Sequence, residues 1–267
     1  QLGPGELGFL TAQIKEVRTR TDNPFGVNLR ADQPDFPRRV DLLIEHGVKV
    51  ASFARAPGKD GIQRLKAAGI VTMPTIGARK HAQKVADWGV DAVIAQGGEG
   101  GGHTGSVPTS LLLPDVVDAV GDRVVVLGAG GFSDGRGLVA ALAYGAHGIA
   151  MGTRFLLTQE STVPDATKAA YLGTGVEGTV VTTAVDGYPQ RVVRTPFIDA
   201  LERAGFVGRI VAALRHAAAL KGLTDTSLWA LFQEGLAMKR NSTLTWPQVA
   251  MAANAPIYTR ATLIDGR

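Results

Sequence analysis

Short apolar runs alternate with amphipathic segments through the first 150 residues or so, and this pattern predicts repeated strand–helix units. Six runs are typical of buried strands: residues 25–29, 48–53, 70–73, 92–95, 124–127 and 148–151. Amphipathic segments such as 38–46, 61–68 and 78–88 follow them, and each of these three is followed by a glycine suited to a helix C-cap: Gly47, Gly69 and Gly89.

Repeated units of this kind predict a parallel sheet covered by helices. Six strands fit a doubly wound sheet, or six of the eight strands of a (β/α)8 TIM barrel, which has about 250 residues when whole. The segment from Pro4 to Arg20 is helix-like with no strand ahead of it, which favours a barrel whose first two strands are missing from this sequence. No Gly-x-Gly-x-x-Gly follows an early strand, so the dinucleotide fingerprint of the doubly wound fold is missing too.

The repeat stops after Thr153. Residues 180–194 have the pattern of a hairpin around Asp186-Gly187, and residues 206–220 and 227–240 have helical patterns. We therefore expect two domains: a barrel over residues 1–160, and a mostly helical C-terminal cap over residues 161–267 that covers the mouth of the barrel.

Composition excludes several classes of function. The 267 residues are 45% hydrophobic and contain no cysteine, so disulfides, thiolate metal sites and a cysteine nucleophile are excluded. The net charge of +4 suits anionic ligands such as phosphates or CoA thioesters, but no dense basic run with interleaved aromatics indicates nucleic acid. No apolar run is long enough for a membrane span and no signal peptide is visible, so a cytoplasmic location is the default expectation.

The active site of a barrel lies where the strands end and the following loops begin. The fourth strand leads into Gln96-Gly-Gly-Glu-Gly-Gly-Gly-His-Thr-Gly105, in which six of ten residues are glycine. His103 is therefore the candidate acid/base residue, because an imidazole titrates near neutral pH. Glu99 could pair with His103 or be solvated. Asn28 and Ser52 lie near the ends of the first two strands.

The loops after the last two strands indicate a phosphate site. Gly130 and Gly131 lead into a helix start that Ser133 or Asp134 could cap, and Gly152 and Thr153 follow the last strand at once. Backbone N–H groups near a helix start bind phosphate in this fold. No set of residues has metal-ligand spacing, and no Gly-x-Ser-x-Gly indicates a serine hydrolase.

Four segments together resemble the nitronate monooxygenase (2-nitropropane dioxygenase) family in order and approximate spacing. They are residues 25–28, 96–105 with Gly-Gly-His-x-Gly, 129–131, and 151–155 with Met-Gly-Thr-Arg-Phe. The resemblance is strong over residues 1–160 and looser beyond them. It implies an FMN-dependent barrel with a substrate-binding cap, in which two further strands normally open the barrel.

The resemblance also implies roles for individual residues. Asn28 and Gln96 would contact the isoalloxazine ring, with the glycine pair Gly101 and Gly102 near it. His103 would be the acid/base residue beside the flavin. The ribityl phosphate would be held by Gly130, Gly131, Ala150, Met151, Gly152 and Thr153.

Several activities stay open. The family label implies oxidation of alkyl nitronates with O2. One departure, Ala150 where many relatives have Gln, removes an amide from the phosphate region. The His103 loop and residues 245–254 also resemble flavin enzymes that act on CoA thioesters in steroid-ring breakdown, with NAD(P)H as redox partner.

Two alternatives need no flavin. One is a phosphate-binding barrel that acts as an isomerase or synthase with His103 as general base, and a more distant one is a non-catalytic phospholigand-binding barrel. The oligomeric state is open, with a homodimer as one option.

Overall fold

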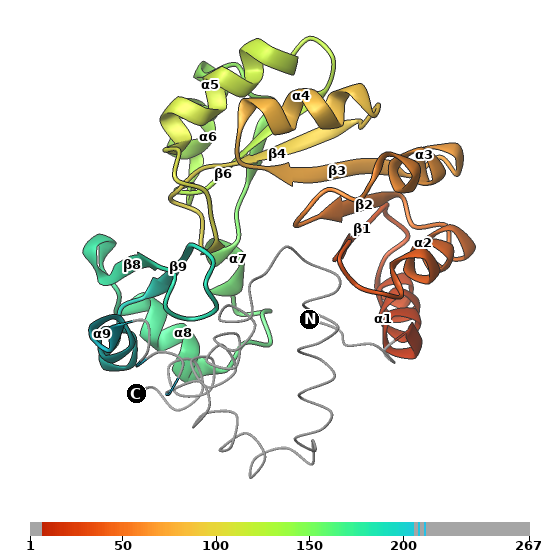
Figure 1. The fold of residues 1–267 in the computed structure, drawn as a ribbon. Helices are drawn as coiled ribbons and strands as arrows, with labels where there is room; N and C mark the ends of the chain where they lie inside the picture. The colour runs from red at the N-terminus through yellow and green to blue at the C-terminus, as the bar shows by residue number, and fades with distance from the viewer. Residues whose placement is uncertain (1–6, 206–207, 209–210, 212–267) are drawn as a thin grey trace. The chain divides into compact units, whose positions relative to one another are not determined.

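The structure, a computed structural model, describes residues 7–205, 208 and 211 (Figure 1). Its contacts divide the chain into two compact units. The first, here called the sheet unit, comprises the described residues up to Glu99 together with Gly105–Ala150. The second, the hairpin unit, comprises Gly100–Thr104 and the described residues from Met151 onward. The predicted boundary at residue 160 stays a prediction.

The sheet unit contains the six parallel strands that the apolar runs predict. They are β1 (Gly26–Leu29), β2 (Val50–Phe53), β3 (Val71–Ile76), β4 (Ala92–Gln96), β6 (Val125–Ala129) and β7 (Gly148–Ala150). Their order in the sheet is the order in the sequence. A doubly wound sheet reverses its strand order part-way, whereas a barrel does not. The topology is therefore that of a (β/α)8 barrel, and the doubly wound alternative is wrong.

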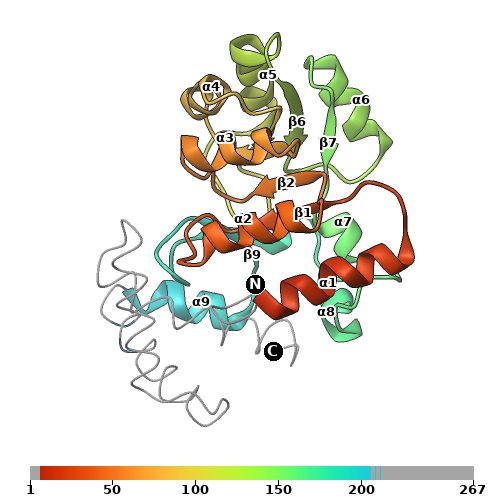
Figure 2. The same cartoon turned by 90° about the vertical axis from the view of Figure 1, so that its right-hand side faces the viewer.

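Helices cover one side of this sheet. Figures 1 and 2 show α2 to α6 on the same face, as right-handed crossovers between sequential parallel strands require. The helices are α1 (Leu7–Arg20), α2 (Phe36–Glu45), α3 (Lys59–Ala67), α4 (Arg79–Asp87), α5 (Thr109–Val120) and α6 (Gly135–Ala143). No helix among the described residues is long and apolar enough to cross a membrane.

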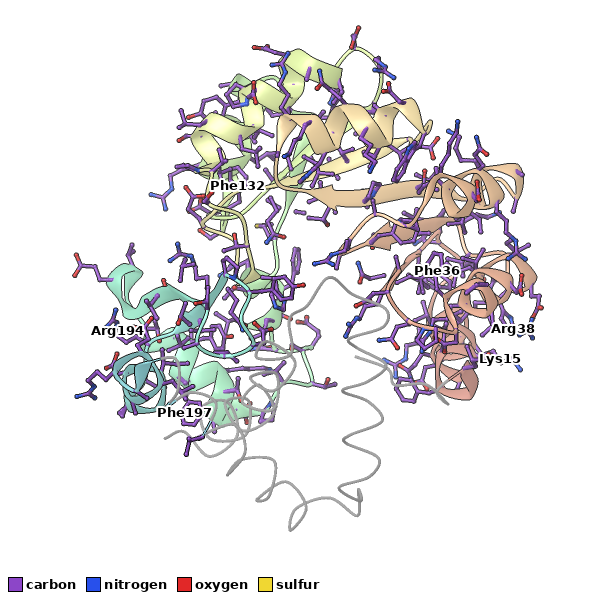
Figure 3. The ribbon with its side chains drawn as sticks, viewed as in Figure 1. Lys15, Phe36, Arg38, Phe132, Arg194 and Phe197 are labelled. Atoms are coloured by element: carbon purple, nitrogen blue, oxygen red, sulfur yellow. The ribbon has the colours of Figure 1, made fainter. Side chains whose placement is uncertain are left out.

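The core of the sheet unit lies between the helices and the sheet. Leu43 of α2, Ile62 and Leu65 of α3, and Leu113 of α5 are fully buried there. Phe36 (labelled in Figure 3) packs edge-on against the buried Phe53, with ring centroids 6.3 Å apart. The same pattern of apolar positions that predicts the helices thus also builds the core.

Three predicted helix ends are confirmed by backbone geometry. Gly47, Gly69 and Gly89 have φ of 57°, 70° and 85°. This left-handed conformation follows the last helical turn and is strained for residues with a side chain. Each glycine therefore stops its helix and lets the chain turn into the next strand.

A hydrogen-bonded carboxylate joins two of the strand–helix units at the amino ends of the strands. Asp91, just before β4, accepts hydrogen bonds from the backbone N and Oγ1 of Thr72 at 2.8 and 2.9 Å, and from Lys66 Nζ at 2.7 Å. Burial raises the pKa of Asp91, but the hydrogen bonds from Lys66 and Thr72 outweigh it, so the pKa lies below its usual value. Thr72 itself is fully buried.

Asp91→Asn should lower the free energy of unfolding at neutral pH by about 1–2 kcal/mol, the order of one or two lost hydrogen bonds to a charged group. A carboxyl whose pKa is lowered on folding contributes stability above its unfolded pKa and loses that contribution as the pH falls through its folded pKa. The deficit should therefore shrink at about pH 3. Urea unfolding at both pH values measures it, and an equal deficit at both would contradict the assignment. Asp87→Asn, which breaks an exposed ion pair with Arg123, is the matched control and should change stability by less than about 1 kcal/mol.

The hairpin unit contains a small antiparallel sheet in the order β5-β9-β8. Its strands are β8 (Thr179–Thr182), β9 (Gln190–Val193) and the two-residue β5 (Gly102–His103). The predicted hairpin around Asp186-Gly187 is confirmed as the connection from β8 to β9. The described helices here are α7 (Thr153–Leu156), α8 (Asp165–Leu172), η1 (Val176–Gly178) and α9 (Pro196–Arg203). Apart from residues 208 and 211, the helices predicted at 206–220 and 227–240 lie outside the described residues.

Candidate functional site

Two amide side chains stand at the carboxyl ends of strands in the sheet unit, as predicted. Asn28 of β1 is opposite Ser52 of β2, and Asn28 Nδ2 donates a hydrogen bond to Ser52 Oγ at 3.0 Å. Gln96 is the last residue of β4 and lies opposite Ala129 of β6. In a barrel this end of the sheet faces the ligand. The structure therefore places both residues at the expected end of their strands.

The start of the glycine-rich loop packs tightly against α5. A Cβ atom on Gly97 would lie 2.1 Å from Thr109 Oγ1 and 2.5 Å from the Thr109 backbone N, so only glycine fits. Gly98 donates its N–H to Val107 O at 2.8 Å, and a Cβ on Gly98 would lie 3.2 Å from Gly105 O. Some glycines of this loop are therefore required by packing rather than by a ligand.

Glu99 has a structural role that the sequence does not predict, since pairing with His103 and solvation are the two options stated above. Its Oε2 accepts hydrogen bonds from the backbone N and Oγ1 of Thr109, at 2.9 and 2.7 Å. Thr109 is the first residue of α5, and a carboxylate there satisfies N–H groups that have no partner within the helix. Glu99 thus anchors the start of α5.

The loop after β6 has the backbone that the phosphate prediction requires. Gly130 and Gly131 have φ of 97° and 78°, so their N–H groups point in directions that residues with side chains rarely allow. Of the two predicted caps of α6, Asp134 is the one observed, accepting from the Arg136 backbone N at 2.9 Å. The hydrogen bond from the Arg136 side chain holds the pKa of Asp134 below its usual value. An ionised carboxylate therefore occupies the N-terminus of α6, which leaves the Gly130–Gly131 turn as the candidate phosphate cradle of this loop.

The remaining predicted cofactor residues lie at the end of β7 and in the hairpin unit. Ala150 ends β7 in the sheet unit, and Met151, Gly152 and Thr153 follow it directly, with Gly152 preceding the first turn of α7. A Cβ on Gly101 would lie 3.9 Å from Thr153 Oγ1. The glycine loop and the start of α7, which are far apart in the sequence, are thus neighbours within this unit. Gly102 belongs to β5 with φ of 73°.

His103 forms the most distinctive polar contact of the hairpin unit. Its Nε2 lies 2.7 Å from Asp186 Oδ2, across 83 residues of sequence. The His103 side chain is 61% exposed, whereas that of Asp186 is 15% exposed. The Tyr188 ring meets the imidazole edge-on, with centroids 5.9 Å apart. An accessible imidazole held by a sheltered carboxylate is an arrangement suited to proton transfer.

The sequence gives no indication that Asp186 and Tyr188 lie beside His103. The sequence predicts the Asp186-Gly187 turn, but as a hairpin connection only. The pair exists because β5 adds to the hairpin, with Gly102 opposite Arg191 and His103 opposite Gln190. A strand of only Gly102 and His103 has no apolar or β-branched residue that would predict it, so the sequence does not indicate this pairing.

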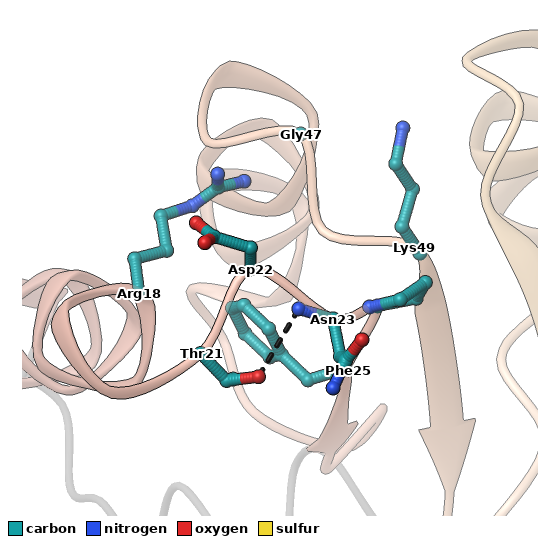
Figure 4. Close-up of a pocket in the computed structure, with 8 residues that line it drawn as sticks. Arg18, Thr21, Asp22, Asn23, Phe25, Gly47 and Lys49 are labelled. Atoms are coloured by element: carbon teal, nitrogen blue, oxygen red, sulfur yellow. Dashed lines mark hydrogen bonds between the residues drawn. The ribbon is translucent and has the colours of Figure 1, made fainter.

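A pocket of about 150 Å³ lies at the opposite ends of the strands. Figure 4 shows its lining at the end of α1 and ahead of β1 and β2: Arg18, Thr21, Asp22, Asn23, Pro24, Phe25, Gly47 and Lys49. The Arg18 guanidinium lies 5.8 Å from the centre of the Phe25 ring. Residues at the amino-terminal face of a barrel serve stability rather than catalysis. This pocket therefore does not compete with the carboxyl-end site.

Comparisons with known proteins identify the family. The family model described as nitronate monooxygenase matches residues 35–241. The chain is 57% identical over 257 residues to "(3aS,4S,5R,7aS)-5-hydroxy-7a-methyl-1-oxo-octahydro-1H-indene-4-carboxyl-CoA dehydrogenase" of Rhodococcus jostii, covering 96% of this chain and 72% of the relative. The structure is similar to FabK from Thermotoga maritima, with 39% identity and a TM-score of 0.70 over 78% of this chain and 68% of that one. It also resembles nitroalkane oxidase from Streptomyces ansochromogenes, with 30% identity and a TM-score of 0.67 over 74% of this chain and 69% of that one. The chain belongs to the nitronate monooxygenase family and is a flavin-type oxidoreductase with the (β/α)8 barrel fold.

Proposed function

We propose that this protein is an FMN-dependent dehydrogenase of a CoA thioester, with His103 as its acid/base residue. The observation that carries the substrate class is the similarity to the Rhodococcus jostii CoA-thioester dehydrogenase along nearly the whole chain. Of the activities that the sequence leaves open, this similarity favours the thioester alternative over oxidation of alkyl nitronates. Family membership gives no support to a flavin-free isomerase or synthase, or to a non-catalytic barrel.

The residues present fit FMN. Asn28 and Gln96 are amides at the carboxyl ends of β1 and β4, able to hydrogen-bond the polar edge of a flavin ring. Gly130 and Gly131 form a turn in the left-handed region, where backbone N–H groups can approach phosphate oxygens closely. We propose that these four residues hold FMN, together with Gly101, Gly102, Ala150, Met151, Gly152 and Thr153.

The chemistry assigned to His103 follows from the substrate. The carbon next to a thioester carbonyl is a weak carbon acid, and its C–H proton needs a positioned base. In a dehydrogenation, His103 would accept that proton while a hydride leaves the neighbouring carbon, so that a C=C bond forms. Bound FMN would supply the hydride acceptor, and its two electrons would pass on to NAD(P)+ or O2.

The contact between His103 and Asp186 also favours a CoA thioester as the substrate, because of the proton that a thioester carries. A nitronate is already a carbanion equivalent, so its oxidation needs no base to remove a proton. A neutral thioester does need one. The 2.7 Å contact from His103 to Asp186 places a carboxylate where it can stabilise the imidazole that accepts this proton.

The direct test is anaerobic mixing of FMN-loaded protein with saturated bicyclic carboxyl-CoA thioesters. We expect flavin absorbance to bleach and an α,β-unsaturated thioester to form, at a rate that falls when the α-hydrogen is replaced by deuterium. Propionate-3-nitronate is the competing substrate. Bleaching by the nitronate but not by the thioesters would refute the proposed function and support oxidation of alkyl nitronates instead.

His103→Ala should lower the rate of thioester-driven flavin reduction by about 10²–10⁴-fold, the range of a general acid–base residue. FMN affinity should change little, because the imidazole is proposed to act on the substrate. Stopped-flow absorbance measures the rate, and fluorescence titration measures the affinity. His81→Ala, on the exposed surface of α4, is the matched control. An unchanged rate in His103→Ala would remove this histidine from the mechanism.

Gly131→Ala should weaken FMN binding by about tenfold or more, because a Cβ strains the turn proposed to hold the phosphate. Gly69→Ala is the matched control, because the φ of Gly69 is 70° and that of Gly131 is 78°. Gly69 lies at the amino end of β3, and a Cβ there would meet open space. Both variants should lose similar stability, and only Gly131→Ala should lose FMN affinity. Equal FMN affinity in the two variants would contradict the phosphate assignment.

A further inference from the structure

We propose that Asp186 is a positioning residue that fixes the tautomer of His103, so that Nε2 carries the proton and Nδ1 is the atom that exchanges a proton with the substrate. The statement about Nδ1 and the substrate rests on the proposed function. The statement about the tautomer rests on the hairpin unit alone.

The orientation of Asp186 is fixed from two sides. Its Oδ1 accepts a hydrogen bond from the Tyr188 backbone N at 3.1 Å, and its Oδ2 lies 2.7 Å from His103 Nε2. Gly187, with φ of 84°, donates its N–H to Thr183 O at 2.9 Å and closes the turn. The carboxylate therefore has one oxygen committed to the backbone and one committed to the imidazole.

His103 is held by the same hairpin. It pairs with Gln190 in the register of β5 and β9, and the next residue, Thr104, donates its N–H to Pro189 O at 3.1 Å. Both members of the pair are thus anchored to one short segment, residues 186–191. The distance between them depends on the hairpin and not on the conformation of the rest of the glycine loop.

An ionised carboxylate can only accept a hydrogen bond. The 2.7 Å contact therefore requires a proton on Nε2, which places the lone pair of the neutral imidazole on Nδ1. When Nδ1 takes up a substrate proton, the carboxylate stabilises the imidazolium that forms. Asp186 would act through His103 in this way, without touching the substrate itself.

Asp186→Asn is the informative variant because the backbone dictates how an amide would sit. The Tyr188 N–H needs an acceptor, so the Asn oxygen would remain there and the Asn NH2 would face Nε2. A donor at that point forces the proton onto Nδ1, the wrong tautomer. Asp186→Ala removes the carboxylate without imposing either tautomer. We therefore expect Asn to be more damaging than Ala, the reverse of the order expected if the side chain only filled space.

Two measurements test this. In FMN-loaded protein with ¹⁵N-labelled histidine, the His103 resonances, assigned with His103→Ala, should show the Nε2–H tautomer in wild type and the Nδ1–H tautomer in Asp186→Asn. In stopped-flow reduction by the thioester, Asp186→Asn should be slower by up to about 10⁴-fold, the size of the effect when a catalytic histidine is held in the wrong tautomer. The rate in Asp186→Ala should fall by less than in Asp186→Asn. The thioester concentration that gives half the maximal rate should change little in both variants. Asp199→Asn, which breaks an exposed ion pair with Arg194 in the same unit (Arg194 is labelled in Figure 3), is the matched control and should change neither measurement.

The outcomes separate this proposal from the proposed function. An Nε2–H tautomer that persists in Asp186→Asn, or a rate in that variant equal to wild type, overturns the role of Asp186. An Nδ1–H tautomer in wild type overturns it without any variant, so the test survives if Asp186→Asn does not fold. Inversion of the tautomer in a protein that no thioester reduces would support the positioning of His103 and refute the thioester assignment.

Discussion

The closed neck of the glycine-rich loop is the constraint on which the candidate site depends. Gly97 lies against the first residue of α5 so closely that no side chain fits, and Gly98 is hydrogen-bonded to Val107 across the neck. Glu99 closes it by accepting two hydrogen bonds from Thr109. The chain therefore leaves the carboxyl end of β4 and returns to it within a few residues. The intervening Gly100–Thr104 segment can then serve as a strand of a different sheet.

Three carboxylates have different roles because they accept hydrogen bonds from different groups. Asp91 and Glu99 each accept hydrogen bonds from the backbone N and hydroxyl of one threonine, Thr72 and Thr109 respectively. These contacts fix the backbone where a strand or a helix begins. Asp186 also accepts a backbone N–H, but its other oxygen meets an imidazole. Because that partner can gain or lose a proton, the third carboxylate can influence a reaction as well as a fold.

The parts of the fold that the sequence predicts are those encoded locally. Short runs rich in apolar residues mark all six parallel strands, and glycines with positive φ mark three of the helix ends. Both signals depend on residues within a few positions of each other. His103 could be chosen as a candidate for the same reason, because it is an imidazole in a glycine loop after a strand. Asp186 was not, because it reaches His103 only through the pairing of β5 with β9, across 83 residues. The role of Glu99 was hidden as well, since a carboxylate ten residues before its threonine follows no capping pattern.

The family name and the proposed substrate differ in one chemical respect that the site itself can express. Nitronates and CoA thioesters both deliver electrons from carbon to a flavin, so the amides and glycine turns proposed to hold FMN can serve either reaction. What separates the two is the fate of the α-proton, which a nitronate has already lost and a thioester still carries. A histidine held beside a sheltered carboxylate can serve as the base that the second reaction needs. The pairing of β5 with the hairpin, which brings His103 to Asp186, is therefore the feature through which one flavin-binding barrel can be directed toward neutral carbon acids.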